Sequence, residues 1–220
     1  MGSTTLTKPD SVRGLDDFGR GGRGFGGFGG GDRPERERER VPSRSYLIAM
    51  AMALAAIVML FAAFTSALVV RKGLSYDWVS IPIPRVLWLN TALLLASSLT
   101  LELARRALGA HRSEAFARWL YVTTGLGVAF VAGQLLAWRE LAAQGVYLAT
   151  NPSSSFFYVF TAAHGLHLLG GIAALLYLVV RAGPIAAGRQ RRIAVDVTAL
   201  YWHFMDGLWI YILFLLMTRF

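Results

Sequence analysis

The chain has 220 residues, of which 55% are apolar and only 16% are charged, and its mean hydropathy is +0.48. A soluble domain normally carries about 25% charged residues, so this composition argues against an ordinary water-soluble enzyme. The chain contains no cysteine, which excludes disulfides, zinc–thiolate sites and cysteine nucleophiles together.

Residues 1–44 differ in composition from the rest of the chain. They contain a Gly-, Arg- and Phe-rich stretch at 18–31, followed by alternating Glu and Arg at 35–40. Such a segment has too little apolar surface to offset its ordering entropy, so we predict a disordered tail. A Gly–Arg–Phe tract can also bind RNA, but nine Lys/Arg against seven Asp/Glu leave the tail a net charge of only +2. We therefore expect no nucleic-acid partner and interpret the tail as a solvated tether.

Five apolar segments follow the tail, and each is long enough to cross a bilayer, which takes about 20 residues of helix. They are Tyr46–Val70, Val86–Ala104, Trp119–Trp138, Phe156–Val180 and Ile193–Met217. The short connections predict that successive helices are antiparallel neighbours, and Ser155 is the expected N-cap of the fourth helix. The predicted fold class is all-α: a polytopic membrane protein with a disordered N-terminal tail at 1–44 and a five-transmembrane-helix bundle at 45–220.

The distribution of basic residues predicts the orientation of the bundle. With the N-terminus in the cytoplasm, 17 Lys and Arg residues fall on the cytoplasmic side and five fall on the outer side. Cytoplasmic loops of membrane proteins carry an excess of Lys and Arg. We therefore expect a cytoplasmic N-terminus and a C-terminus on the outer side.

Ionisable side chains inside the predicted spans are costly, so they usually face the bundle interior or a wet cavity. His164 and His167 are three residues apart and share a helix face, as do His203 and Asp206 in the next span. With a rise of about 1.5 Å per residue, His167 lies about 16 Å from the outer end of its span and His203 about 15 Å from the inner end of the next. Because these depths match in an antiparallel pair, we predict one polar cluster of these four residues, with a His–Asp contact that offsets the burial of both groups.

Three roles are open to this cluster. A haem needs histidines on facing helices and a metal site needs three or more convergent ligands, whereas His164 and His167 share one turn. A proton path needs a chain of carboxylates through the membrane, and only Asp206 is central. The third role, which we favour, is a structural cluster that fixes helix register. We therefore expect no catalytic residue and no metal site in this chain.

Three motifs resemble those of the cytochrome c oxidase subunit III family. Residues 90–98 read NTALLLASS, which resembles the family's NTxxLLxSS signature. Residues 156–167 read FFYVFTAAHGLH and residues 201–209 read YWHFMDGLW, which are similar to FYxxTxxHGLH and YWHFVDxxW. The motifs occur in family order and spacing, and the similarity covers residues 45–220 in the short five-helix form of the family. The residues matched to family positions are Asn90, Thr91, Ser97, Ser98, Gln134, Gly165, Tyr201 and Trp209.

The resemblance implies a non-catalytic integral membrane subunit of a haem–copper terminal oxidase, the proton-translocating cytochrome c oxidase of aerobic respiratory electron transport, in a bacterial-type inner (plasma) membrane. In this family haem and copper lie in subunits I and II, so no cofactor is expected in this chain. Subunit III packs on subunit I, holds lipid near the oxygen entry route and protects the proton-uptake side during turnover. The expected partners are subunits I and II and membrane phospholipids. Candidate lipid contacts are Arg105, Arg106 and Arg112, which are placed to meet anionic headgroups, together with Trp202.

Two positions depart from the family pattern. The family often has a glutamate in the first span within an SEVxxF-like stretch, but the matching stretch at 55–61 has Ile57 and no acid. The family also often reads QxxE in the third span, whereas Gln134 is followed by Ala137. Roles of those glutamates do not carry over to this chain. Two alternatives remain: an accessory subunit of a nitric oxide reductase, or a free-standing small membrane transporter or scaffold.

Overall fold

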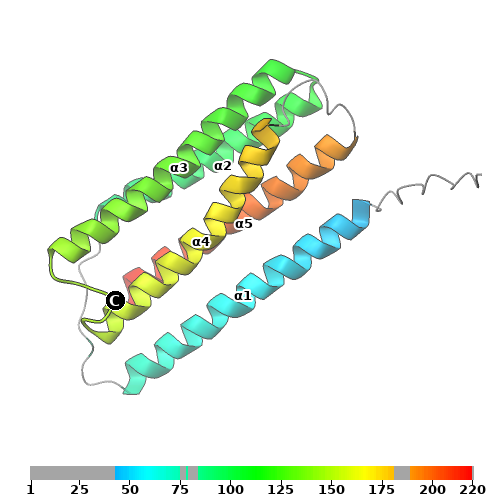
Figure 1. The fold of residues 1–220 in the computed structure, drawn as a ribbon. Coiled ribbons are helices and arrows are strands. Elements are labelled where there is room, and N and C mark those ends of the chain that lie inside the picture. Colours follow the sequence, from blue (N-terminus) through cyan, green and yellow to red (C-terminus); the bar gives the residue numbers. More distant parts are fainter. Residues whose placement is uncertain (1–42, 75–77, 79–83, 181–188, 220) are drawn as a thin grey trace, which may run out of the picture. The chain divides into compact units, whose positions relative to one another are not determined.

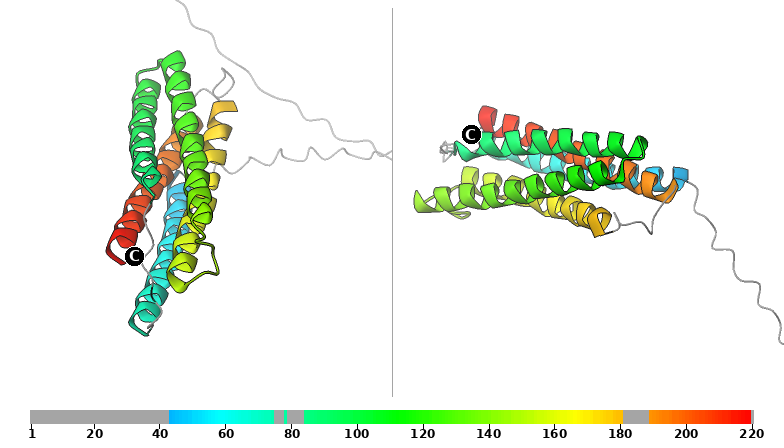
Figure 2. Two further views of the ribbon diagram at one scale, coloured as in Figure 1. Left: turned by 90° about the vertical axis from the view of Figure 1, so that its left-hand side faces the viewer. Right: turned by 90° about the horizontal axis from the view of Figure 1, so that it is seen from above.

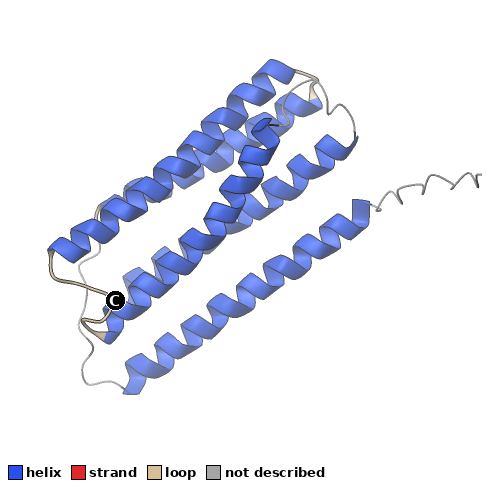
Figure 3. Ribbon diagram, viewed as in Figure 1, coloured by secondary structure: helices blue, strands red, loops and turns tan. Residues whose placement is uncertain are grey.

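The computed structural model describes residues 43–74, 78, 84–180 and 189–219 of the chain. These residues form five helices: α1 (Ser43–Leu74), α2 (Val86–Gly109), α3 (Ser113–Ala143), α4 (Pro152–Val180) and α5 (Arg189–Arg219) (Figure 1). Over these described ranges the secondary structure is helix without strand (Figure 3). Each helix is long and apolar enough to cross a membrane, which confirms the predicted all-α, polytopic fold class.

The chain divides into two units, residues 1–40 and residues 41–220. The predicted disordered tail lies outside the described residues as far as position 42, and Ser43 is the first residue of α1. The five helices all belong to the second unit, and the fold described below is that of this unit alone.

All five helices are longer than the apolar segments that predict them. The third segment begins at Trp119, whereas α3 begins six residues earlier and continues five residues past Trp138. The 31 residues of α3 give a length of about 46 Å, well beyond the ~30 Å hydrocarbon core. The helix ends therefore reach the headgroup region, where charged side chains cost little and apolar composition no longer marks the helix.

The N-terminus of α4 differs from the prediction, because Ser155 is not its N-cap. The side chain of Asn151 takes that role: its Oδ1 accepts the backbone N–H of Ser154 at 2.8 Å and the hydroxyl of Ser153 at 2.6 Å. The hydroxyl of Ser154 in turn accepts the backbone N–H of Asn151 at 3.2 Å, as in a capping box. Pro152 suits the first helical position because an N–H would have no partner there.

Successive helices pack as antiparallel neighbours from α2 to α5, but α1 is an exception to this prediction. Among the described residues, α1 packs against α4 and α5 and not against α2, while α5 also packs against α2 (Figure 2). The connection between α1 and α2, from 75 to 85, is long enough to let α1 lie beside helices distant in the sequence. By contrast, α2 and α3 are joined by a tight turn in which His111 takes a left-handed φ of 57°.

Glycines on α3 allow a close approach of its neighbours. A Cβ added at Gly133 would lie 2.1 Å from Oδ1 of Asn90 in α2, and one added at Gly127 would lie 2.7 Å from the Trp202 ring of α5. Small residues at helix interfaces are typical of membrane bundles, where association depends on van der Waals contact rather than on the hydrophobic effect. Gly133 therefore lets α2 pack closely against α3, and Gly127 leaves room for the Trp202 ring.

Candidate functional site

A row of side-chain hydrogen bonds joins α2 to α5. Trp202 donates its indole N–H to Oγ of Ser97 at 2.9 Å, and Trp209 donates to Oγ1 of Thr91 at 3.0 Å. A third contact joins Nδ1 of His203 to the hydroxyl of the serine that follows Ser97, at 2.5 Å. We call this set the α2–α5 seam, and its members are Thr91, Ser97, Ser98, Trp202, His203 and Trp209.

The seam follows from similar spacings of donors and acceptors on two antiparallel helices. The acceptors Thr91 and Ser97 are six residues apart and the donors Trp202 and Trp209 are seven apart, and both spacings are close to two helical turns. Both indole rings are fully buried. Because an indole N–H is a donor only, each ring needs an acceptor inside the bundle, and the hydroxyls of α2 provide one. The sequence analysis matched these hydroxyls to a family motif but did not pair them with the tryptophans of the last span.

Other motif residues extend these polar contacts to α3 and α4. Asn90 donates from Nδ2 to Oε1 of Gln134 at 3.4 Å, and both side chains are buried. Tyr201 donates its hydroxyl to the backbone carbonyl of His167 at 2.8 Å. Gly165 is the exception among the motif residues, since a Cβ added there would meet no atom within 4 Å. The residues matched to the family motifs therefore gather mainly where helices of this chain touch.

The two histidines of α4 turn to different neighbours. His164 is fully buried, and its ring lies 5.2 Å from that of Trp209. Nδ1 of His167 instead bonds the carbonyl of Ala163 in its own helix at 2.7 Å, and its ring lies 6.2 Å from that of Phe61 in α1. Within the described part of the chain, no three His, Asp or Glu side chains are placed to hold a metal ion.

The predicted contact between a histidine and Asp206 includes no hydrogen bond among the described residues. His203 turns to Ser98 on α2, and the carboxylate oxygens of Asp206 have no hydrogen-bond partner among the described residues. Asp206 is nevertheless only 5% exposed. For His203, the partner is supplied by α2 rather than by α4.

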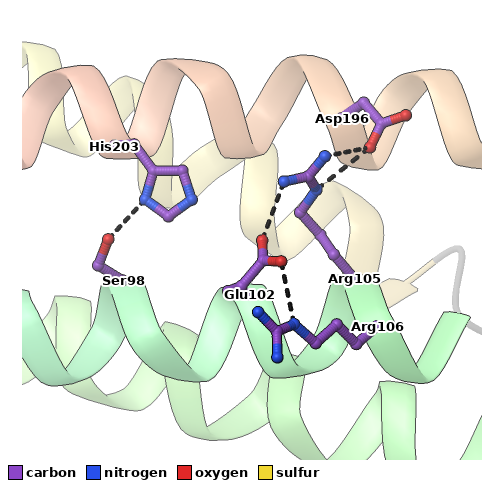
Figure 4. A network of polar contacts seen from close by, with 6 residues as sticks. All are labelled: Ser98, Glu102, Arg105, Arg106, Asp196 and His203. Carbon is purple, nitrogen blue, oxygen red and sulfur yellow. Dashed lines mark hydrogen bonds and ion pairs between the residues drawn. The ribbon is translucent and has the colours of Figure 1, made fainter. Parts of the chain in front are cut away.

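Beyond His203 the contacts between α2 and α5 change from neutral to charged (Figure 4). Arg105 donates from Nε and Nη2 to Oδ1 of Asp196 at 3.2 and 2.9 Å, and from Nη1 to Glu102 at 2.9 Å. Arg106 donates from Nε to the other oxygen of Glu102 at 3.2 Å. These four residues, which we call the charged cluster, link the last turns of α2 to the first turns of α5. All are partly exposed, as expected for ion pairs near a membrane surface.

The four candidate lipid contacts fall into three different environments. Arg105 and Arg106 belong to the charged cluster, and Arg112 is exposed in the turn between α2 and α3. Trp202 is fully buried and bonded to Ser97, so no lipid outside the bundle reaches it. A lipid contact at Trp202 is therefore excluded by its burial, and its motif position is explained by the α2–α5 seam.

These features define a polytopic helical membrane protein whose intramembrane polar side chains mainly join its own helices. The sequence profile of the family described as Cytochrome c oxidase subunit III matches residues 44–219, which is most of the chain. The chain therefore belongs to the cytochrome c oxidase subunit III family, and the resemblance seen in its three motifs is confirmed.

Individual relatives agree with the family profile. The chain is 36% identical over 122 residues to the probable cytochrome c oxidase subunit 3 of Mycobacterium tuberculosis, a match that covers 54% of this chain and 59% of that protein. It is 29% identical over 171 residues to the cytochrome c oxidase subunit 3 of Thermostichus vulcanus, covering 74% of this chain and 82% of that protein. A third relative, from Synechocystis sp., is 33% identical over 128 residues, covering 58% and 53% of the two chains.

Proposed function

We propose that this chain is the non-catalytic subunit III of a haem–copper terminal oxidase, a cytochrome c oxidase of aerobic respiration. In that role it packs on subunit I, stabilises it, and holds structural phospholipid near the oxygen entry route. Haem and copper would belong to the partner subunits I and II. The basic residues of the tail and of two loops favour a cytoplasmic N-terminus.

One observation carries the accessory role: the three intramembrane histidines make separate contacts inside the bundle. His164 packs on Trp209, His167 bonds a carbonyl of its own helix, and His203 bonds Ser98. A haem would need histidine nitrogens that converge on one iron from facing helices. Side chains engaged with three different neighbours support packing and helix register instead.

Copurification tests this proposal. An affinity tag on this chain should recover a mild-detergent complex that contains haem–copper subunits I and II, with oxidase turnover and a haem spectrum. The chain released from the complex should show no Soret band. Recovery without any haem–copper partner, or a stoichiometric Soret band in the isolated chain, would refute the proposal.

Variants of Asp206 add a second test to the same experiment, because a buried carboxylate is the residue best suited to a proton path. Asp206→Asn keeps the side-chain shape, so the complex should assemble and its initial turnover should stay near normal. Asp206→Ala opens a cavity and should weaken assembly more than Asp206→Asn does. A strong loss of initial turnover in a fully assembled Asp206→Asn complex would instead indicate proton transfer through this chain.

A further inference from the structure

Three buried side chains, one each from α2, α3 and α4, keep polar atoms that no other side chain or backbone group satisfies. These atoms are Oδ1 of Asn90, Nε2 of Gln134 and both ring nitrogens of His164, which have no hydrogen-bond partner among the described residues. All three side chains are buried. A buried polar atom without a hydrogen bond is costly, above all in a membrane-spanning bundle that bulk water does not reach.

Gln134 and His164 lie at the same level of the contact between α3 and α4. Phe130, one turn before Gln134 on α3, has its ring 5.9 Å from that of His164. Trp138, one turn after Gln134, donates its indole N–H to Oγ1 of Thr161 in α4 at 3.1 Å. Residues four apart share a helix face, and the two helices are antiparallel. The amide of Gln134 therefore faces the turn of α4 that runs from Thr161 to His164.

Side chains of α2 and α5 close the same region from the other two helices. Asn90 donates from Nδ2 to Oε1 of Gln134 at 3.4 Å. Trp209 bonds the residue that follows Asn90, and its ring lies 5.2 Å from that of His164. Four helices therefore contribute one side chain each to a single buried layer, which we call the polar layer: Asn90, Gln134, His164 and Trp209. Among the described residues, no hydrogen bond joins His164 to the two amides of this layer.

We propose that the polar layer binds a structural water molecule, held between Nε2 of Gln134, a ring nitrogen of His164 and Oδ1 of Asn90. The amide nitrogen is a donor, the amide oxygen is an acceptor, and a neutral imidazole offers one of each. A single ligand for all three groups must both donate and accept hydrogen bonds, as water does. Buried waters typically make about three hydrogen bonds to polar groups that would otherwise be unsatisfied. The site gives His164 a role that aromatic packing alone does not require, and it does not depend on the proposed function.

Radiolytic labelling of the full chain in nanodiscs tests the site, because X-ray pulses split bound water into radicals that oxidise the side chains beside it. Phe130 and Phe160 are a matched pair, since both are buried. Phe130 contacts His164, whereas Phe160 packs against Phe61 and Phe64 of α1. Mass spectrometry should therefore find much more oxidation at Phe130 than at Phe160. Oxidation at Phe130 no greater than at Phe160 would overturn the proposal, since it would indicate either a dry layer or general access of solvent.

Variants of the polar layer connect this labelling to the proposed ligands. His164→Phe keeps an aromatic ring but removes both nitrogens, so oxidation of Phe130 should fall to the level of the control phenylalanine. Gln134→Leu removes the amide donor and should have the same effect. His167→Phe is the matched control and should leave the oxidation unchanged, because His167 bonds the carbonyl of Ala163 in its own helix. Undiminished oxidation of Phe130 in either polar-layer variant, with folding verified by circular dichroism, would overturn the proposal.

A direct hydrogen bond between Gln134 and His164, formed by rotation of the two side chains, is the competing explanation. In a double-mutant cycle of Gln134→Leu and His164→Phe, the unfolding equilibrium in SDS should depart from additivity by roughly threefold, the size of an average intramembrane hydrogen bond. A coupling of this size without oxidation at Phe130 would assign the contact to the two side chains alone and overturn the water site. Additive effects would show that the two side chains share no ligand, and would overturn it as well.

Discussion

The helix α1 and the α2–α5 seam hold to the rest of the bundle by different means. α1 buries a single apolar stripe that includes Ile57, Phe61 and Leu68, while most of its remaining surface is exposed. Its side-chain hydrogen bonds to α5 are exposed: Thr65 bonds Tyr211 at 2.8 Å, and Lys72 donates to the backbone carbonyl of Arg219. The seam instead buries whole indole rings together with their hydrogen bonds.

This difference reflects what stabilises helix contacts in lipid. An apolar stripe gains little by leaving lipid for protein, because lipid tails are as apolar as leucine. Close packing and buried hydrogen bonds do favour the protein contact, since a buried donor without a partner would be costly. We therefore expect α2, α3 and α5 to form the rigid part of this chain and α1 to be the more weakly held helix.

The largest expected loss of stability comes from a substitution at the contact between α3 and α2. Gly133→Ala would place a methyl group 2.1 Å from Oδ1 of Asn90, a buried side chain that already contacts Gln134. Overpacking of this kind typically costs about 1–3 kcal/mol, measured as the free energy of unfolding in an SDS titration. Gly125→Ala is the matched control on the same helix, because its added Cβ meets no atom within 4 Å. Equal stability of the two variants would show that the α2–α3 contact is not tightly packed.

A smaller loss of stability is expected when one hydrogen bond of the seam is removed. Ser97→Ala leaves the buried indole N–H of Trp202 without its acceptor, and Trp202→Phe removes the donor. A double-mutant cycle in the same SDS titration should give a coupling of about 0.6 to 1.7 kcal/mol, the range from average to largest for intramembrane hydrogen bonds. A coupling near zero would contradict a stabilising role for the seam.

The smallest coupling is expected between α1 and α5. Thr65 keeps a second partner, the carbonyl of Phe61 at 2.8 Å, when Tyr211→Phe removes the tyrosine hydroxyl. A double-mutant cycle of Thr65→Val and Tyr211→Phe should therefore give less than the average of about 0.6 kcal/mol for bonds inside a membrane. A coupling as large as that of the seam would remove the contrast between the two regions.

The fold was predictable to the level of its five spans, because length and apolar composition are local properties of the chain. The ends of the helices were not, since helices continue into the headgroup region where composition changes. The N-cap of α4 illustrates this: Asn151 caps the helix four residues before the expected Ser155, and the turn Asn-Pro-Ser-Ser provided the signal. The packing of α1 against α4 and α5 was likewise not predicted, because a connection of eleven residues does not require α1 and α2 to be neighbours.

The candidate site was predictable only in part. The spacing of His203 and Asp206 predicted that both lie on one face of α5, and the arginines at the end of α2 were interpreted as candidate lipid contacts. The pairing of Ser97 with Trp202 was not recognised, although the bonded hydroxyls recur after six residues on α2 and the indoles after seven on α5. Trp202 illustrates the limit most clearly, because a tryptophan in a membrane span suits either a lipid contact or a buried anchor until its neighbours are known.

By itself, the sequence determined that this protein is a five-span helical membrane protein of the subunit III family, because hydrophobic length and motif order are carried along the chain. The tertiary structure alone decided which polar side chains meet. His203 finds Ser98 rather than a residue of α4, and Arg105 spans from α2 to Asp196. Helical periodicity fixes the face on which a side chain lies, whereas its partner depends on how the packed helices are arranged and rotated against one another.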